Sequence, residues 1–317
     1  MEGLAMESQF GIIDIGSNTI RMNIYEVQNA QAAMISTISR PAGLAGYIEN
    51  KKLTDKGIDV LSSTLTEYQA MLAERHIEAC FPFATASLRN ITNTQQVLDE
   101  IEKRNGLRID LISGKEEAQL SFKGAKEAFV ESQGLYIDTG GGSTEMVLYD
   151  PAGVRFAVSL PVGSLNLYED YIDQLFPTKE EIHAIHHHIK ALIKEQDLER
   201  DDWKADTLCV TGGSFRAIRA LLAELGWIET TQTVFPVQLL RDLLDYINKD
   251  AHHFLRLLIR IVPTRINTLI PGLLIVETIA KWCRADQVQC SFLGIREGYL
   301  KEKLPYNRQE RSESAHE

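Results

Sequence analysis

Two stretches of the chain, residues 9–39 and residues 134–160, share one order of apolar and polar positions. In each stretch an apolar strand ends in an aspartate, a loop of glycine and hydroxyl residues follows, and two further strands are joined by a turn. The loops run Asp14-Ile-Gly-Ser-Asn-Thr19 and Asp138-Thr-Gly-Gly-Gly-Ser-Thr-Glu145. Self-similarity of this kind is typical of a chain that arose by internal duplication.

Two more pairs of segments match in the same order. Phe83–Ile91 resembles Val210–Ile218, and each is read as a strand that runs into the start of a helix with a hydroxyl residue at the cap. Leu111–Leu120 resembles Phe292–Leu300 in the same way. Three matched segments in one order are hard to obtain by chance, so we infer that the chain contains two duplicated domains.

Between these segments, apolar residues recur with the period of a helix. Thr54 is a suitable N-cap for a helix whose apolar face is formed by Ile58, Leu61, Leu65, Tyr68 and Leu72. Further helices are predicted at 95–104, 178–196, 214–225, 236–248 and 270–284, and a strand at 108–112. This alternation predicts an α/β fold. We place a first domain at residues 1–130 and a second at 131–317, whose last helix can pack back on the first domain.

The composition excludes several classes of protein. Of the 317 residues, 44% are hydrophobic and 24% are charged, as in an ordinary soluble globular protein. The net charge of −11 argues against nucleic acid as a partner, and no apolar run approaches the roughly 20 residues that cross a bilayer. The start of the chain lacks the basic and apolar regions of a signal peptide, and the four cysteines form no CxxC pair. We therefore expect a cytoplasmic protein that binds neither nucleic acid nor membrane.

The two glycine loops have the chemistry of anion sites. Glycine lets the backbone approach an anion, and successive N–H groups then form a nest for phosphate oxygens. Ser17, Thr19, Ser143 and Thr144 add hydroxyl donors, and the aspartate that opens each loop suits Mg²⁺. One such loop alone is more simply explained as a hairpin turn, whereas two loops at matching places favour a shared ligand. Neither loop has the sequence of a Walker A motif or of a dinucleotide-binding fingerprint.

Six motifs carry a family resemblance. In chain order they are DIGSNTIRM, ATASLRN, ISGKEEA, DTGGGSTEM, TGGS and IREG. Over residues 9–305 they closely resemble the exopolyphosphatase / guanosine pentaphosphate phosphohydrolase (Ppx/GppA) family. The resemblance implies a place in the superfamily of acetate and sugar kinases, heat-shock 70 proteins and actin, with two ribonuclease-H-like (actin-like) domains and an active site in the cleft between them. Longer members carry a further C-terminal region, so the chain resembles a short, two-domain member.

The resemblance also implies roles for individual residues. Hydrolysis of a phosphoanhydride needs positioning, neutralisation of negative charge and an oriented water. The family's general base corresponds to the glutamate before the alanine of the GKEEA segment, which is Glu117, with its neighbour Glu116 as the weaker candidate. Without the family, both glutamates are explained as the solvated first turn of a helix. Glu145 is a second catalytic candidate, and Asp138 with Asp14 is predicted to hold Mg²⁺ or another divalent cation. The predicted phosphate ligands are Gly16, Ser17, Asn18, Thr19, Arg89, Gly140, Gly141, Gly142, Ser143 and Thr144.

We therefore predict an exopolyphosphatase that removes terminal phosphates from inorganic polyphosphate. Two alternatives stay open, a guanosine pentaphosphate 5′-phosphohydrolase and a non-catalytic sensor that binds polyphosphate or guanosine alarmones. The acidic set of Asp14, Glu117, Asp138 and Glu145 favours catalysis, because a pure binder need not keep it. For Arg89, an interdomain salt bridge is the alternative to phosphate binding. The sequence decides neither the preferred chain length nor the oligomeric state, for which a homodimer is one candidate.

Overall fold

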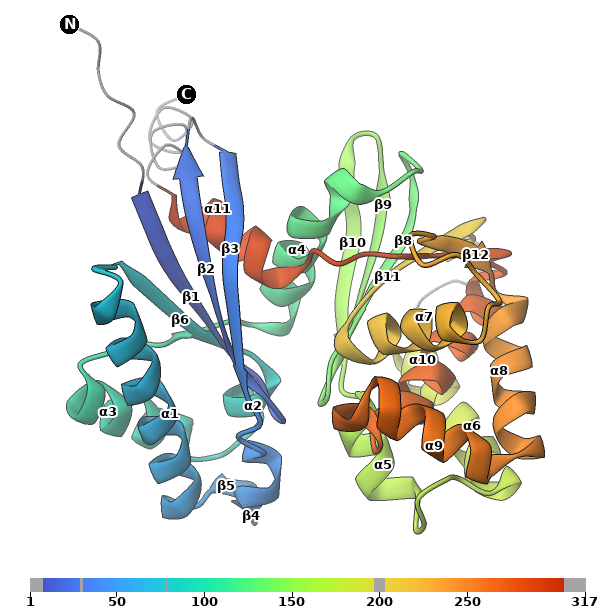
Figure 1. Ribbon diagram of the computed structural model, residues 1–317, viewed down its shortest axis with the longest axis horizontal. Helices are drawn as coiled ribbons and strands as arrows, with labels where there is room; N and C mark the ends of the chain where they lie inside the picture. The colour runs from blue at the N-terminus through green and yellow to red at the C-terminus, as the bar shows by residue number, and fades with distance from the viewer. Residues whose placement is uncertain (1–7, 29–30, 78, 197–202, 305–317) are drawn as a thin grey trace, which may run out of the picture. The chain divides into compact units, whose positions relative to one another are not determined.

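The computed structural model describes residues 8–28, 31–77, 79–196 and 203–304, and the chain divides into two compact units. Unit 1 comprises the residues up to Gly114 together with those from Tyr299 onward, and unit 2 runs from Lys115 to Gly298. The chain therefore passes between the units twice, at the start of one helix and in the middle of another. Each unit has its own sheet (Figure 1). The domain boundary near residue 130 stays a prediction.

Unit 1 is built on a five-stranded sheet with the order β3-β2-β1-β6-β7. These strands are β1 (Ser8–Ile15), β2 (Ile20–Gln28), β3 (Gln31–Arg40), β6 (Cys80–Ala84) and β7 (Asp110–Leu111). The other elements that lie wholly in this unit are α1 (Asp55–Glu74), α2 (Ala86–Arg89), α3 (Thr94–Asn105), a single 3-10 turn (Leu44–Tyr47) and the small hairpin of β4 (Ile48–Glu49) and β5 (Lys52–Leu53). α1 and α3 lie side by side and share one apolar core with the strands (Figure 1).

Unit 2 is built on a six-stranded sheet with the order β10-β9-β8-β11-β13-β12. These strands are β8 (Gly134–Thr139), β9 (Thr144–Asp150), β10 (Gly153–Leu160), β11 (Thr207–Thr211), β12 (Val234–Pro236) and β13 (Gln287–Cys290). The helices are α4 (Gly114–Ala125), α5 (Ser164–Tyr171), α6 (Lys179–Glu195), α7 (Gly213–Glu224), α8 (Gln238–Lys249), α9 (Ala251–Ile261), α10 (Leu269–Cys283) and α11 (Ile295–Lys303), with 3-10 turns at Lys126–Ala128 and Pro263–Arg265. The five neighbouring strands β10-β9-β8-β11-β13 correspond in order to β3-β2-β1-β6-β7 of unit 1, as duplication predicts.

The two glycine loops occupy equivalent places in the two sheets. Loop 1 joins β1 to β2 and loop 2 joins β8 to β9, both pairs being antiparallel. Each first strand also pairs in parallel with the strand that leads into the next matched helix, β6 in unit 1 and β11 in unit 2. Asp14 and Asp138 therefore stand at the same position of a central strand. Their cross-strand partners differ, because Asp14 pairs with Arg21 whereas Asp138 pairs with Glu145.

The two faces of β8 serve different cores, because successive side chains of a strand point to opposite sides. Leu135 and Ile137 are fully buried in the large core that includes the residues of α7 and α10. Tyr136, from the other face, packs in a smaller core with Ala118 and Phe122 of α4. α4 therefore covers the face of the sheet to which Tyr136 belongs.

α4 touches the start of α11 through glycine. A side chain at Gly124 would overlap the carbonyl of Gly294, and one at Gly298 would overlap the carbonyl of Leu120. Two backbones can come this close only where Cβ atoms are absent. These contacts, all within unit 2, fix the position of α4.

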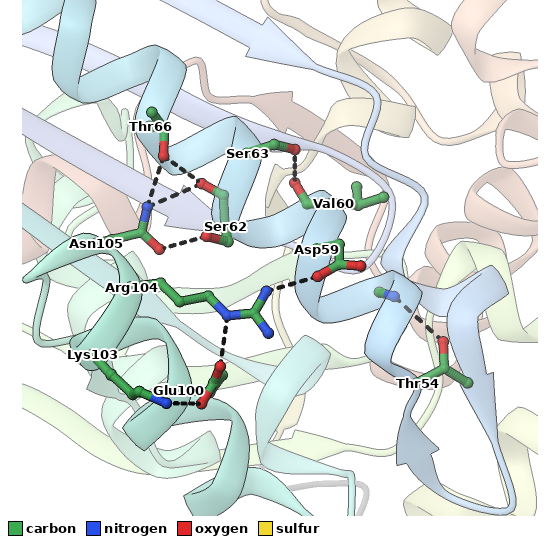
Figure 2. Close-up of polar contacts among 11 residues, drawn as sticks. Thr54, Asp59, Val60, Ser62, Ser63, Thr66, Glu100, Lys103, Arg104 and Asn105 are labelled. Atoms are coloured by element: carbon green, nitrogen blue, oxygen red, sulfur yellow. Dashed lines mark hydrogen bonds and ion pairs between the residues drawn. The ribbon is translucent and has the colours of Figure 1, made fainter.

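The helix starts and ends predicted from the sequence are largely confirmed. The Thr54 hydroxyl caps α1 by accepting a hydrogen bond of 3.3 Å from the N–H of Gly57. α3 ends at Asn105, and Gly106 takes the left-handed conformation that favours glycine at this position. Figure 2 shows how this end is tied to α1, since Asn105 Nδ2 donates to the Ser62 carbonyl and to Thr66 Oγ1, each at 3.0 Å.

Two helices of unit 2, α5 and α9, were not predicted. α9 follows α8 after the single residue Asp250, whose side chain accepts a hydrogen bond of 2.9 Å from the N–H of His253. With no glycine or proline between them, the two helices lack the usual punctuation in the sequence. α10 is the most apolar helix and its residues are almost all buried, yet no helix in the described ranges is long and apolar enough to cross a membrane.

The second half of α11 belongs to unit 1 and is held there by Asp110 of β7. Tyr299 Oη donates to Asp110 Oδ2 over 2.7 Å, and Lys303 forms an ion pair with the same oxygen. The Tyr299 ring also packs against Phe83 with ring centres 4.6 Å apart. Partial burial tends to raise the pKa of Asp110, but the hydrogen bonds from Lys303 and Tyr299 outweigh it and lower the pKa below its ordinary value.

We expect Asp110→Asn to lower the Tm at neutral pH. A lowered native pKa stabilises the fold above about pH 4, the ordinary range of Asp, and this stability is lost as the pH falls through the native pKa. A half-exposed ion pair contributes at most about 1 kcal/mol, which corresponds to about 2 °C in Tm. Thermal unfolding between pH 3 and 7 should show a difference at pH 7 that vanishes at low pH. Asp99→Asn, on the exposed side of α3, is the control, and an equal loss there would contradict the account.

Candidate functional site

Three acidic residues of unit 2 lie on α4 and on the two strands that flank loop 2. Asp138 and Glu145 are directly opposite each other at the loop end of β8 and β9. Glu117 lies in the first turn of α4, is 8% exposed, and is near enough for its charge to act on Glu145. The prediction that these residues belong to one site is consistent with this placement, although their roles stay predictions.

Glu145 has the most perturbed environment of the three. It is 1% exposed. Burial, and then the negative charges of Glu117 and Asp138, raise the pKa of Glu145 well above its ordinary value, while hydrogen bonds from Ser159 and Ser143 act in the opposite direction. The Ser159 hydroxyl, directly across on β10, donates to Glu145 Oε1 over 2.7 Å. A buried group of like charges with too few counter-charges is typical of a functional site.

Asp138 is held by the core beneath it. Ser121 of α4 donates a hydrogen bond to Asp138 Oδ2 and lies 2.6 Å from the hydroxyl of Tyr136. Burial, followed by the charges of Asp138 and Glu145, raises the pKa of Tyr136 well above its ordinary value. Ser121 is one helical turn after Glu117, so both side chains are on one side of α4.

Loop 2 is fixed through its carbonyl groups. The carbonyls of Gly140 and Gly141 accept hydrogen bonds from the first N–H groups of α5, at 2.8 to 3.2 Å. The loop approaches so closely that a side chain at Gly163 would overlap Gly141. No acceptor for the N–H of Gly141 or Gly142 lies among the residues that the structure describes. The loop therefore keeps amide donors available, as an anion nest requires.

Ser143 and Thr144 of loop 2 are buried and take part in internal hydrogen bonds, whereas the buried hydroxyl of Thr139 has no partner within the described ranges. Thr144 Oγ1 donates to the Val162 carbonyl over 2.6 Å, and Ser143 bonds to Glu145. Both side chains are at most 4% exposed. In this structure the two hydroxyls hold the loop in place, and their contact with phosphate stays a prediction.

Three arginines gather at the start of α7, a feature that the sequence reasoning missed. Burial and the charge of Arg296 lower the pKa of Arg216, against the opposing charge of Asp138. Burial and the charge of Arg216 likewise lower the pKa of Arg265. The Arg265 guanidinium lies against Gly213, the first residue of α7, where a side chain would overlap it. The guanidinium of Arg265 has no hydrogen-bond or ion-pair partner within the described ranges, whereas its backbone N–H donates to the Val262 carbonyl. Guanidinium groups at a helix N-terminus form a site suited to phosphate.

The repeat contained a signal for one of these arginines. Arg216 aligns with Arg89 in the matched segments, so selecting Arg89 as a phosphate ligand also pointed to Arg216. Arg265 and Arg296 carried no comparable signal. Arg265 is the last residue of the 3-10 turn between α9 and α10, and its approach to Gly213 exists only in the fold.

Loop 1, in unit 1, has the same backbone design as loop 2. The carbonyls of Ser17, Asn18 and Thr19 accept hydrogen bonds from the N–H groups of Ala45, Gly43 and Gly16, at 2.9 to 3.2 Å. Side chains of the loop are partly exposed.

The other predicted site residues of unit 1 are Asp14, near the end of β1, and Arg89, at the end of α2. Ser87 at the start of α2 donates to the Ile15 carbonyl. Arg89 Nη1 donates to the Ile112 carbonyl over 2.9 Å, which uses part of its guanidinium inside the unit. Unit 1 therefore carries Asp14, loop 1 and Arg89, and unit 2 carries Glu117, Asp138, loop 2 and Glu145.

The carboxylates of unit 2 fit a divalent cation of the Mg²⁺ type. Mg²⁺ keeps several waters and is held by one or two carboxylates and the substrate's phosphates. Asp138 and Glu145 offer carboxylates side by side; burial first, and then the charges of Glu117 and Asp138, raise the pKa of Glu145, and a cation there would relieve the repulsion between these charges. In the described part of the chain, no three His, Cys, Asp or Glu side chains form a complete metal site. A cation there would take its remaining ligands from water and phosphate.

A family model decides the relationship to known proteins. The model of the Ppx/GppA phosphatase family matches residues 24–307. The chain belongs to the Ppx/GppA phosphatase family. This match confirms the resemblance that the six motifs predicted, and with it the enzyme class, since the family is one of phosphatases.

Curated relatives of this Ppx/GppA family member include an exopolyphosphatase and a bifunctional enzyme. Exopolyphosphatase 1 of Mycobacterium tuberculosis is 22% identical over 303 residues, which cover 93% of this chain and 88% of the relative. The bifunctional 3-dehydroquinate synthase/phosphatase of Fusobacterium nucleatum is 30% identical over 207 residues, which cover 61% of this chain and 30% of the relative.

Solved structures confirm the fold. An exopolyphosphatase from Cytophaga hutchinsonii superposes with a TM-score of 0.81 at 19% identity, covering 92% of this chain and 96% of that chain. The Ppx/GppA family member of Aquifex aeolicus gives a TM-score of 0.74 at 23% identity, covering 93% and 97%. The α/β fold of two actin-like bodies predicted from the sequence is therefore confirmed.

We expect Arg265→Gln to weaken the binding of tripolyphosphate about tenfold or more. A hydrogen bond from a charged donor contributes about 1.5–3 kcal/mol, and about 1.4 kcal/mol corresponds to a factor of ten in Kd. Isothermal titration calorimetry gives the Kd directly. Arg260→Gln is the matched control, because it removes the same charge from an exposed ion pair with Glu224. If the two substitutions weakened binding equally, Arg265 would contribute only through the overall charge of the protein and would not be a specific phosphate ligand.

Proposed function

We propose that this family member is an exopolyphosphatase that hydrolyses terminal phosphoanhydride bonds of inorganic polyphosphate. One observation carries the proposal: Asp138 and Glu145 face each other at the end of a loop with available amide donors, and buried Glu117 is near enough for its charge to act on Glu145. A carboxylate at this place can accept a proton from water, and donors beside it can hold the phosphate under attack. The names of the relatives, exopolyphosphatases of similar length, support the same substrate.

In the proposed reaction Glu117 orients a water molecule and takes its proton. The water oxygen forms a bond to the terminal phosphorus while the bond from that phosphorus to the bridging oxygen breaks, and the shortened chain leaves with that oxygen. The N–H groups of Gly141 and Gly142, with Arg216 and Arg265, hold the oxygens on which negative charge develops. These groups are fixed before the substrate arrives, so little reorganisation is needed in the transition state.

Asp138 and Glu145 would hold Mg²⁺, and Asp14 of unit 1 stays a predicted ligand. When bound, Mg²⁺ supplies positive charge that neutralises phosphate oxygens and polarises the bond to be broken. Buried Glu145 keeps its hydrogen bond from Ser159, so its carboxylate has a defined orientation. A role for Glu145 in orienting the water is compatible with the same position.

Polyphosphate is preferred to guanosine pentaphosphate for a chemical reason. The groups gathered near Asp138 are amides, hydroxyls, carboxylates and guanidiniums, which suit the recognition of phosphate and not of a nucleobase. A ligand with many equivalent phosphates also rebinds at high effective concentration. Hydrolysis of guanosine pentaphosphate and non-catalytic binding are therefore outcomes for the experiment to decide. A cytoplasmic location and a homodimer stay predictions; all four cysteines are free thiols, as a reducing compartment requires.

We expect Glu117→Gln to lower kcat by about 10²-fold or more while polyphosphate binding is kept, the usual scale for loss of a general base. Phosphate release is measured on polyphosphate of defined lengths and on guanosine pentaphosphate, with Mg²⁺ varied. Glu116→Gln is the matched control, since it changes the neighbouring glutamate of the same helical turn.

Three results would change the proposal in different ways. Near-normal turnover of Glu117→Gln would mean that another residue is the general base, and Glu116 would be the next candidate to test. A kcat/KM tenfold higher on guanosine pentaphosphate would show that the protein recognises guanine, which corresponds to about 1.4 kcal/mol in the transition state. Tight binding of polyphosphate without any phosphate release would make the protein a sensor.

A further inference from the structure

A line of hydroxyl groups connects Asp138 to the interior of unit 2. Ser121 Oγ bonds to Asp138 Oδ2 at one end and is 2.6 Å from Tyr136 Oη at the other. Ser121 and Tyr136 are both 0% exposed. Tyr136 and Asp138 are two residues apart on β8, so they project from one face of the sheet, and Ser121 reaches them from α4.

The chemistry of the groups fixes the direction of these hydrogen bonds. An ionised carboxylate can only accept, so Ser121 must use its single hydrogen toward Asp138. The Ser121 oxygen is then left as an acceptor, and Tyr136 must donate to it. The order is therefore Tyr136 Oη–H to Ser121 Oγ, and Ser121 Oγ–H to Asp138 Oδ2. Because each of these hydrogen bonds has only one possible donor, the series holds the Asp138 carboxylate in a defined orientation.

The far end of the line is anchored in packed aromatic rings. The Tyr136 ring has its centre 6.0 Å from that of Phe122 and 5.5 Å from that of Phe129. Phe122 is on α4, next to Ser121, so the ring contact and the hydrogen bond both tie α4 to β8. The rotation of the Asp138 carboxylate is thereby linked to a rigid core, and so is the turn of α4 that carries Glu117.

We propose that Tyr136 and Ser121 are positioning residues, which orient the Asp138 carboxylate for a divalent cation. The proposal rests on the proposed function only in assigning the cation to Asp138. Partners that orient a metal-binding side chain typically change metal affinity by about 10–100-fold when they are removed. Tyr136 and Ser121 act through Asp138 and touch neither cation nor substrate.

The test compares Tyr136→Phe and Ser121→Ala with a matched control, Tyr149→Phe. Tyr149 is also buried and packs on Phe122 and Phe129, with ring centres at 4.9 and 5.5 Å. Its hydroxyl is directed to the Glu131 carbonyl and to Cys209 instead of to the site. Loss of this hydroxyl reproduces the loss of buried polarity in the same aromatic cluster without touching Asp138.

The probe is Mn²⁺, whose free concentration is measured by electron paramagnetic resonance on the full chain without substrate. We expect Tyr136→Phe and Ser121→Ala each to raise the Kd for Mn²⁺ about tenfold, and Tyr149→Phe to leave it within about twofold. The Mg²⁺ concentration for half-maximal phosphate release should rise in parallel, with kcat largely regained at saturating Mg²⁺. In the double variant Ser121→Ala/Tyr136→Phe the effects should not add, because both act through one line.

The outcomes separate this inference from the proposed function. Mn²⁺ affinity of Tyr136→Phe equal to that of Tyr149→Phe overturns the positioning role, whether or not the parent hydrolyses polyphosphate. A parent that binds no Mn²⁺ also overturns it. Weakened Mn²⁺ binding in a protein that releases no phosphate supports the positioning role and contradicts the hydrolase. Thermal unfolding checks each variant, and Ser121→Ala carries the test alone if Tyr136→Phe does not fold.

Discussion

Negative charge buried around Glu145 is the constraint on which the rest of unit 2 depends. Burying like charges together is unfavourable unless nearby groups compensate. Ser159 and Ser143 compensate Glu145 in part, and Arg216 brings an opposite charge near Asp138, yet the pKa of Glu145 stays raised. The remaining excess favours the binding of a cation, and a cation there attracts phosphate. We therefore propose that the unfavourable electrostatics of this acidic group would be the source of its affinity for a cation.

Duplication explains how one scaffold supports two different loops. Both units place an aspartate at the end of a central strand and fix the following loop through its carbonyls. The charges around the two loops have diverged, since Arg21 stands opposite Asp14 where Glu145 stands opposite Asp138. Arg89 is bonded inside unit 1 to a backbone carbonyl, whereas its counterpart Arg216 is near the carboxylates. Unit 2 thus carries more of the charged groups that we predict to take part in the reaction, and unit 1 carries a loop with a similar backbone and fewer charges around it.

The sequence could predict what depends on local spacing. Thr54 as a cap, the glycine loops and the repeated strand order follow from residues close together in the chain, and all are present in the structure. Contacts between residues far apart in the chain could not be predicted from the sequence. Nothing near Arg265 in the sequence indicates that it lies against Gly213, and nothing near Tyr136 indicates its line through Ser121 to Asp138. Such contacts depend on which helix covers which face of a sheet, and that is decided by packing of the whole unit.

Phosphate release in water enriched in ¹⁸O tests the central claim most directly. Attack of water on the terminal phosphorus, with cleavage of its bond to the bridging oxygen, puts one atom from water into each orthophosphate that is released. We predict that mass spectrometry of the first orthophosphate formed from polyphosphate will show one ¹⁸O in each molecule. Orthophosphate without ¹⁸O would mean that water attacks the inner phosphorus, so that the terminal phosphate leaves with the bridging oxygen, and a shortened chain without orthophosphate would mean that another acceptor takes the phosphoryl group. Either result, or bound polyphosphate with no release at all, would contradict the account.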